Sequence, residues 1–274
     1  MSEIIIDTSR CTGCGICTRV CPYLIIGMNE STEKALVNPV FSPFCSHCGH
    51  CSAICPEAAI TVTYPDAGPV PQIAGESMPT PEALSQLILM RRSIRSYSGN
   101  AVRKETLEQI FDIVRYAPTG MNGQSVHWLV MQDPDEVRAL VSRIIGWAED
   151  TLKKQPDHML APLFPMVIEA YKQGDDRICH GAPCLVIAHG HQANPVGFID
   201  SIIALTHLDL TAPVFGLGTC WAGIVQIALD SSPDLMASLG LPEGHKSHYA
   251  MMIGYPNLRY ARIPSRNTAK IIWK

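Results

Sequence analysis

CTGCGICTRVCP (residues 11–22) and CSHCGHCSAICP (residues 45–56) are two copies of one pattern, Cys-x2-Cys-x2-Cys-x3-Cys-Pro. Together they use eight of the eleven cysteines in the 274-residue chain. Thiolates spaced three residues apart allow a tight loop to wrap one face of a small metal cluster. Glycines inside both runs permit the backbone angles that such a loop needs. The repeat therefore predicts a small N-terminal unit built around metal-bound cysteines.

Iron–sulfur clusters fit this pattern better than zinc or disulfide bonds. Zinc sites use separated Cys-x2-Cys pairs rather than a stride of three cysteines closed by a fourth. Disulfides form in oxidising compartments, and the start of the chain, MSEIIID, lacks the features of a signal peptide. In two-cluster proteins with this pattern, the fourth cysteine of each run binds the cluster of the other run. The rule predicts two [4Fe-4S] clusters, one held by Cys11, Cys14, Cys17 and Cys55 and the other by Cys45, Cys48, Cys51 and Cys21.

The segment around these runs resembles a clostridial-type two-cluster ferredoxin over residues 1–63. Between the runs, residues 35–37 (Ala-Leu-Val) form a strand-like segment. His47 and His50 lie inside the second run, and two roles stay open for them. They are either solvated neighbours of the cluster site, or they take part in ligation or proton coupling.

Composition and charge exclude several classes of partner. The formal net charge of −4 offers no broad basic surface for nucleic acid or an anionic membrane. Apolar residues make up 47% of the chain and charged residues 17%, so a sizeable buried core is expected. The longest apolar stretch, residues 196–218, is interrupted by Asp200, His207 and Asp209, which favours a buried helix over a membrane span. We expect a cytoplasmic protein with no nucleic-acid and no membrane partner.

Residues 64–81 are dense in proline and glycine and separate two kinds of sequence. Such a density predicts an extended linker rather than a helix or strand. Thr80 and Pro81 then suit the N-cap and the first position of a helix. The predicted organisation is a two-cluster domain at 1–63, this linker, and a larger domain at 82–274.

Hydrophobic periodicity predicts helices and strands in the larger domain. Residues 104–116 have apolar positions at helical spacing, and residues 133–147 predict a second helix with Asp133 as its cap. Short apolar runs predict the strands of a central sheet at 127–132, 183–189, 248–254 and 268–273. We expect an α+β fold, in which a central mixed sheet is covered by helices.

Four further segments carry possible cofactor chemistry. RRSIR (91–95) has three cations and a hydroxyl that suit a phosphate, although a solvated basic cluster is the plainer interpretation of that segment alone. APTGMNGQ (117–124) is a polar loop before a predicted strand. GLGTCWAG (216–223) lies between two apolar helices, and its glycine spacing is not a dinucleotide fingerprint. Residues 254–267 begin with Gly-Tyr-Pro and include Arg266.

In this order the four segments resemble the nitroreductase family of FMN enzymes, and the resemblance covers residues 82–274. It implies a mixed sheet covered by helices, and an entwined homodimer with two FMN sites at its interface. It also implies that the flavin carries the chemistry, since no catalytic side-chain acid can be assigned. The implied FMN-binding residues are Arg91, Arg92, Ser93, Arg95 and Arg266 for the phosphate and ribityl chain, Thr119, Gly120, Asn122 and Gln124 from the partner subunit, and Leu217, Gly218, Ala222 and Gly223 around flavin N5 and O4.

Several other residues are left without an assigned role. Cys220 is expected to be a small packing residue near the flavin, with a redox-active thiol as the alternative. Cys179 and Cys184 are expected in the core or the substrate pocket. His189 and His191 have metal-compatible spacing, but no neighbour in the sequence completes a site.

Together the two parts resemble ferredoxin–nitroreductase fusions. They predict an FMN oxidoreductase that collects single electrons through the clusters and passes electron pairs by ping-pong hydride transfer to a small organic electrophile. About eight irons and one FMN per chain are expected. NAD(P)H or an external ferredoxin remains open as the donor. Two other functions also remain open: a redox carrier or sensor that serves a protein partner, and a dehydrogenase that runs in the reverse direction.

Overall fold

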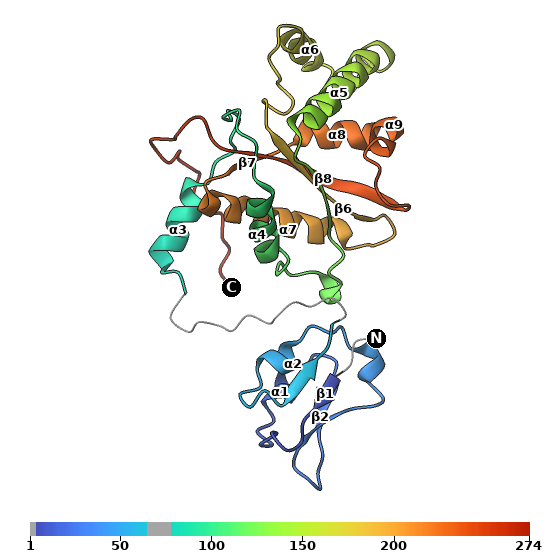
Figure 1. The fold of residues 1–274 in the computed structure, drawn as a ribbon, viewed down its shortest axis with the longest axis vertical. Coiled ribbons are helices and arrows are strands. Elements are labelled where there is room, and N and C mark those ends of the chain that lie inside the picture. Colours follow the sequence, from blue (N-terminus) through green and yellow to red (C-terminus); the bar gives the residue numbers. More distant parts are fainter. Residues whose placement is uncertain (1–3, 65–77) are drawn as a thin grey trace. The chain divides into compact units, whose positions relative to one another are not determined.

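The computed structural model describes residues 4–64 and 78–274, arranged in two compact units (Figure 1). The first unit comprises Met1–Met78 with Gly120–Gly123, and the second comprises Pro79–Thr119 with Gln124–Lys274. Most of the predicted linker, residues 65–77, lies outside the described residues. The predicted domain boundaries at 63 and 82 therefore stay predictions.

The first unit consists of two small antiparallel sheets and two short helices. β1 (Ile4–Ile6) pairs with β4 (Ile60–Val62), and β2 (Ile26–Met28) pairs with β3 (Ala35–Val37). The helices are α1 (Ile16–Val20) and α2 (His50–Ala53), and the 3-10 turn η1 (Ser42–Phe44) precedes the second cysteine run. The strand predicted at residues 35–37 is confirmed.

The sequence repeat of the first unit is also a structural repeat. Each run contains one helix, and β2 and β4 begin at the same distance after the first cysteine of their runs. Ile25, Ile26 and Ile60 are buried and form the core together with Cys17 and Ala35. Because this core is small, the unit relies on what the cysteines bind for much of its stability.

The second unit is built on a four-stranded sheet with the order β5-β6-β8-β7. The strands are β5 (His127–Met131), β6 (Cys184–His191), β8 (His245–Gly254) and β7 (Gly218–Trp221), and every pairing between them is antiparallel. A parallel bridge between Ser93 and Thr219 places the chain around Ser93 beside β7, at the edge of the sheet. The predicted α+β class, a central sheet covered by helices, is confirmed, and the Ser93–Thr219 bridge supplies a parallel contact at the edge of the otherwise antiparallel described sheet.

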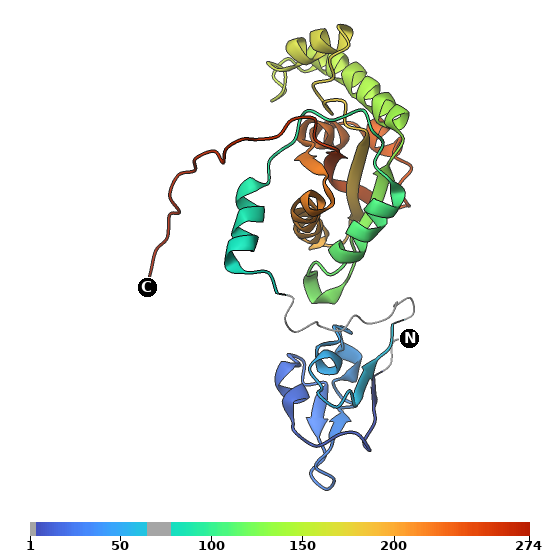
Figure 2. The same ribbon diagram turned by 60° about the vertical axis from the view of Figure 1, so that its left-hand side comes forward.

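Helices cover both faces of this sheet (Figure 2). One face packs on α5 (Pro134–Lys154), α6 (Phe164–Lys172), α8 (Gly223–Ser231) and α9 (Pro233–Ala237). The other face packs on α4 (Lys104–Val114) and α7 (Gly197–Thr211), which continues into the 3-10 turn η3 (Ala212–Phe215). Along β6, Leu185 and Ile187 point to the first layer, while Val186 and Ala188 point to the second. This double burial explains why β6 is apolar at every position from 184 to 188.

Two helix starts follow from the local sequence as expected. Thr80 accepts a hydrogen bond from the amide of Ala83 and caps α3 (Pro81–Met90). Asp133 accepts one from the amide of Asp135 and caps α5, which runs seven residues beyond the predicted end at 147. In both helices proline occupies the first position, where no amide donor is needed.

One predicted strand is wrong, and one strand was not predicted. Residues 268–273 form no strand; they belong to an extended C-terminal arm (Figure 2). Ile272 and Trp273 of this arm are 87% and 86% exposed. The segment 216–223 lies between helices, as expected, but it also contains strand β7, which was not predicted. A four-residue strand carries too short a pattern to be seen in sequence, and β7 forms because the edge of β8 offers it partners.

The apolar stretch at 196–218 is helical, as expected. Among the described residues, Gly197–Phe215 is the one helical segment long and apolar enough to cross a membrane, judged by length and composition. Leu205 and Leu208 of this segment are fully buried against the sheet, so here it serves as a core helix.

Candidate functional site

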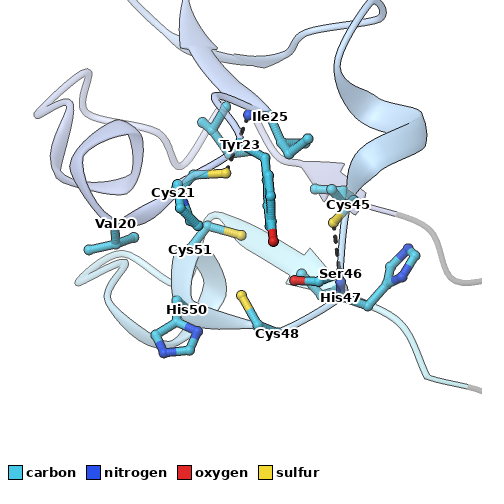
Figure 3. Close-up of a pocket in the computed structure, with 15 residues that line it drawn as sticks. Val20, Cys21, Tyr23, Ile25, Cys45, Ser46, His47, Cys48, His50 and Cys51 are labelled. Atoms are coloured by element: carbon cyan, nitrogen blue, oxygen red, sulfur yellow. Dashed lines mark hydrogen bonds between the residues drawn. The ribbon is translucent and has the colours of Figure 1, made fainter. Parts of the chain in front are cut away.

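The first unit gathers its eight run cysteines around two cavities. One cavity is lined by Cys21 of the first run together with Cys45, Cys48 and Cys51 of the second, and Figure 3 shows their sulfur atoms facing a common space. The other cavity is lined by Cys11, Cys14, Cys17 and Cys55. This grouping matches the crossover pattern predicted from the sequence, while the role of these cysteines as cluster ligands stays a prediction.

Backbone amides donate to the cysteine sulfurs at matching positions of the two runs. The amide of Ile25 lies 3.3 Å from Cys21 Sγ, and the amide of Ala59 lies 3.3 Å from Cys55 Sγ. In both cases the donor is four residues after the fourth cysteine of its run. The amides of His47 and Ala35 approach Cys45 Sγ and Cys11 Sγ at 3.4 and 3.5 Å. Such donors stabilise negative charge on sulfur, which a thiolate-bound cluster requires.

Glycines allow the loops to close around the cavities. Gly15 and Gly49 immediately precede α1 and α2 with φ of 70° and 74°, in the left-handed region that other residues rarely adopt. At Gly49 a Cβ atom would also lie 2.8 Å from the Tyr64 hydroxyl. These loops fit a bound cluster, because they leave four sulfurs and several amides facing one space.

Burial and hydrogen bonding act in opposite directions on the cysteine thiols. Burial raises the pKa of Cys17 and of Cys51. The amides of Ala35 and Gly13 lower the pKa of Cys11. His47 contacts its neighbour Cys45 through the backbone, and Figure 3 shows the rings of His47 and His50 pointing away from the four sulfur atoms. The structure thus favours the solvated interpretation of both histidines.

In the second unit, the arginine-rich segment 91–95 is attached to β7. The Ile94 amide donates to the Thr219 carbonyl at 2.8 Å, next to the Ser93–Thr219 bridge. Arg91 Nη1 lies 3.3 Å from Asp209 Oδ2, and Arg95 is exposed. This arrangement keeps the hydroxyl of Ser93 and the cations of the segment close to the strand that leads into α8.

Helix α8 begins directly after β7 and presents free backbone donors. No side chain caps its N-terminus, so the first-turn amides from Gly223 onward lack an intrahelical acceptor and carry the positive end of the helix dipole. The Ala222 amide, in contrast, donates to the Ala250 carbonyl at 2.9 Å. Of the two amides predicted to face flavin N5 and O4, that of Ala222 is therefore already used within the sheet, and only Gly223 is placed to donate.

Leu217 and Gly218 have structural explanations of their own. Leu217 is 2% exposed and belongs to the core that packs on α4 and α7. A Cβ atom at Gly218 would overlap the Ile94 side chain and lie 3.0 Å from Pro256. Gly218 therefore lets the arginine segment pack closely on β7, and any contact that Leu217 or Gly218 makes with a cofactor has to involve the backbone.

The remaining predicted residues lie in two other places. Gly120–Asn122 form a 3-10 turn, η2, grouped with the first unit, and Met121 and Asn122 have positive φ. Thr119 Oγ1 accepts from the Gln124 amide at 3.0 Å and closes this loop. Arg266 lies in the exposed C-terminal arm, where its guanidinium donates to the Ser265 carbonyl. Within this single chain, Arg266 does not join Arg91, Arg92 and Arg95.

One residue of this region was missed by sequence reasoning. Asp209, on α7, is 5% exposed and accepts hydrogen bonds from Thr219 Oγ1 and, at 3.3 Å, from Trp221 Nε1. It also pairs with Arg91. The sequence did contain a signal for this role. Asp209 lies in a mostly apolar stretch that was expected to be a buried helix, and a buried carboxylate has to find hydrogen-bond or charged partners.

Three thiols outside the runs are buried. Cys179 and Cys184 are 0% exposed and Cys220 is 2% exposed, as a packing role predicts. Burial raises the pKa of all three, that of Cys184 to about 12. Tyr97 is also largely buried, and burial raises its pKa, so its hydroxyl stays protonated and donates to the Ile94 carbonyl at 2.7 Å.

Comparisons with known proteins agree with this architecture. The profile of the nitroreductase family matches residues 88–255, and that of the 4Fe-4S dicluster domain matches residues 3–56. A Bacillus subtilis protein described as an FMN reductase [NAD(P)H] is 30% identical over 175 residues, which span 63% of this chain and 66% of that relative.

Solved structures resemble the second unit. A nitroreductase with bound FMN from Bacteroides fragilis matches with a TM-score of 0.54 and 24% identity, over 69% of this chain and 98% of the other. A nitroreductase with bound FMN from Desulfitobacterium hafniense matches with a TM-score of 0.56 and 18% identity, over the same shares. These likenesses establish the fold. The chain therefore belongs to the nitroreductase family of flavin oxidoreductases, and it carries a 4Fe-4S dicluster domain ahead of that fold.

Proposed function

We propose that this protein is an FMN-dependent oxidoreductase that receives single electrons through two [4Fe-4S] clusters and transfers electron pairs to a small organic electrophile, such as a nitroaromatic or a quinone. The observation that carries the proposal is the pair of four-cysteine cavities in a chain whose larger part has the nitroreductase fold. When bound, iron–sulfur clusters exchange one electron at a time, and FMN connects such exchange to hydride transfer.

The cysteines of the first unit would hold the two clusters. Each set combines three thiolates of one run with the fourth of the other, so both runs are needed for each site. The amides of Ile25 and Ala59 would hold negative charge on Cys21 and Cys55. Since hydrogen bonds to sulfur stabilise the reduced cluster, these amides would raise the reduction potential.

The residues around β7 would hold FMN. The guanidinium groups of Arg91, Arg92 and Arg95 and the Ser93 hydroxyl suit the phosphate. The Gly223 amide, at the positive end of α8, suits an atom that gains negative charge on reduction. Asp209 would orient Arg91 and Trp221 without touching the cofactor. Protons would come from solvent or from a residue of the substrate pocket.

A homodimer would complete the flavin site. Helix α3 has no buried residue in the single chain, and its Leu84, Ile88 and Leu89 are about half exposed. The C-terminal arm likewise exposes Ile272 and Trp273. A second copy would cover these apolar surfaces and bring Arg266 and the loop around Asn122 to the neighbouring site. We further infer a cytoplasmic protein, with NAD(P)H or an external ferredoxin as the donor.

Anaerobic stopped-flow reduction tests the electron path. Reduced ferredoxin should reduce bound FMN in the wild type, and at least about tenfold more slowly in Cys14→Ala and Cys48→Ala, each of which removes one ligand of one cluster. Cys184→Ala, a buried cysteine outside both runs, is the matched control. Equal FMN reduction rates in all four proteins would exclude the clusters from the path.

Substrate turnover separates the proposal from its alternatives. An oxidoreductase should show saturable reduction of nitroaromatics or quinones once its FMN is reduced. Rapid cluster reduction without saturable turnover would indicate a redox carrier or sensor. Net reduction of external ferredoxin by an organic donor would indicate the reverse, dehydrogenase direction.

A further inference from the structure

Four histidines share one end of the sheet in the second unit, on three neighbouring strands. His127 on β5 is paired with His189 on β6, and His191 on β6 is paired with His245 on β8. Directly paired residues, and residues two apart on one strand, project from the same face of a sheet. The register therefore brings together four imidazoles that are far apart in the sequence.

An irregularity in the ladder places His245 in this group, because without it His191 would face Lys246. The pairing of β6 with β8 shifts between Ala188 and His189, so that Ala188 faces Tyr249 whereas His189 faces Ser247. The extra residue, His248, turns to the opposite layer and its Nδ1 lies 2.8 Å from Ser201 Oγ on α7. Bulges of this kind re-aim side chains near functional sites.

The ring nitrogens of two of these histidines already meet. His189 Nδ1 and His245 Nδ1 lie 3.1 Å apart and share a hydrogen bond, in which one ring donates and the other accepts, so a metal ion would have to replace the shared proton. Two nitrogen ligands of one tetrahedral zinc ion, each about 2.0–2.1 Å from the metal, lie about 3.3 Å apart. The His127 ring lies edge-on to His245 with a centroid distance of 4.9 Å, and the His191 ring lies 5.9 Å from His245. The cluster thus has two nitrogens close to ligand spacing, with the rings of His127 and His191 beside them.

We propose that His127, His189 and His245 form a binding site for one divalent transition-metal ion of the zinc class, with water or His191 as the fourth ligand. Among the described residues no three ligand side chains are already gathered in ion-binding geometry, so binding has to turn the exposed His127 ring toward the His189–His245 pair. The ion would connect the edge strand β5 to β6 and β8.

The site is separate from the flavin region. Along β8, His245 lies six residues before Met251, the partner of Trp221, which is about 20 Å at ~3.3 Å per residue. A redox-inactive ion there would act on the sheet, where it would stabilise the β5 edge, and would take no part in the flavin chemistry.

Zinc retention by the full chain, with its iron–sulfur clusters and FMN in place, tests the site. The protein is incubated anaerobically with Zn2+, dialysed, and analysed for zinc by mass spectrometry and by X-ray absorption at the zinc edge. We expect about one retained zinc per chain, with nitrogen ligands at about 2.0–2.1 Å. His127→Gln and His245→Gln should each weaken zinc binding at least about tenfold.

Controls make the outcome decisive. His207→Gln replaces an exposed histidine of α7 whose Nδ1 is hydrogen-bonded to the Ile203 carbonyl, and it should retain zinc as the wild type does. If His245→Gln fails to fold, zinc retention by the His127→Gln variant decides the question, because the His127 side chain is exposed and its replacement should leave the fold intact. No retained zinc, sulfur ligands at about 2.3 Å, or undiminished binding in the His127→Gln variant would each overturn the proposal.

Discussion

The guanidinium of Arg91 lies 3.3 Å from the buried carboxylate of Asp209, a residue in the interior of helix α7. The same carboxylate binds the Thr219 hydroxyl and the Trp221 indole of β7. One buried charge thus connects the core helix, the central sheet and the arginine-rich segment. This connection explains how Arg91, one of the cations proposed to bind a phosphate, is held in place.

Asp209→Asn should weaken FMN binding by about tenfold or more. Hydrogen bonds to a charged group contribute about 1.5–3 kcal/mol, and about 1.4 kcal/mol corresponds to a tenfold change in affinity. Fluorescence titration of the flavin-free protein measures the dissociation constant. Asp150→Asn, which removes an exposed ion pair with Lys154, is the control and should change it little. An unchanged constant in Asp209→Asn would remove Asp209 from the positioning of Arg91.

Double cysteine variants should reveal which cysteines share a cluster. Cys14→Ala and Cys55→Ala are each expected to lose about four irons per chain, and their combination should lose no more than either alone. The double variant Cys14→Ala/Cys21→Ala should lose about eight irons per chain, because these two cysteines line different cavities. Iron and sulfide analysis of anaerobically purified protein provides the counts. If instead the Cys14/Cys55 double variant lost about eight irons and the Cys14/Cys21 double variant about four, each run would bind its own cluster.

Cys184 should resist alkylation in the folded protein. Burial raises its pKa to about 12, so at pH 8 its thiolate is about a thousandfold scarcer than in an ordinary exposed cysteine. Iodoacetamide labelling followed by mass spectrometry should find Cys184 unmodified until denaturant is added. Rapid labelling of the native protein would show that the site opens.

The raised pKa of Cys184 also predicts a loss of stability in alkali. Above pH ~9 the unfolded chain releases this proton, while the folded protein retains it up to about pH 12. The free energy of unfolding should therefore fall as the pH rises through this window. Cys184→Ala should show a smaller fall, measured by urea unfolding at several pH values.

Asp176→Ala should destabilise the second unit by about 1.5–3 kcal/mol. Its carboxylate accepts hydrogen bonds from the amides of Ile178 and Cys179 at 2.8 and 2.9 Å and of Gly181 at 3.0 Å, in the loop that leads into β6. Urea unfolding measures the loss. Asp175→Ala, which removes only an exposed ion pair with Arg177, should stay within about 1 kcal/mol of the wild type, and an equal effect of both substitutions would contradict this assignment.

Removal of residues 257–274 should weaken dimer formation. In the single chain this arm buries nothing, and Ile272 and Trp273 are among its most exposed apolar side chains. Light scattering after size-exclusion chromatography should find a dimer for the full chain and a larger monomer fraction for the shortened one. Lys274→Ala, at the end of the arm, is the control. A shortened chain that remains fully dimeric would show that the arm is not needed for assembly.

Local features of the sequence were sufficient to predict much of this protein. The cysteine spacing defined two runs, because a cluster needs its ligands at short and regular intervals. Caps such as Thr80 and Asp133 located helix starts, since their hydrogen bonds involve residues only a few positions away. Long apolar periodicity likewise identified α4, α5 and the strands β5, β6 and β8. The nitroreductase fold followed from four segments in the right order, and the family comparison confirmed it.

Only the tertiary structure decided the contacts between distant segments. Strand β7 is too short to leave a pattern and forms because β8 offers an edge, whereas residues 268–273 have a strand-like composition but no partner strand in the described chain. The Asp209–Arg91 pair and the His189–His245 pair depend on packing and on strand register. Sequence alone therefore determined the features that depend on residues close together along the chain, such as the cysteine runs and the helix caps. The tertiary structure determined the contacts between residues that are distant in sequence, because these depend on packing and strand register.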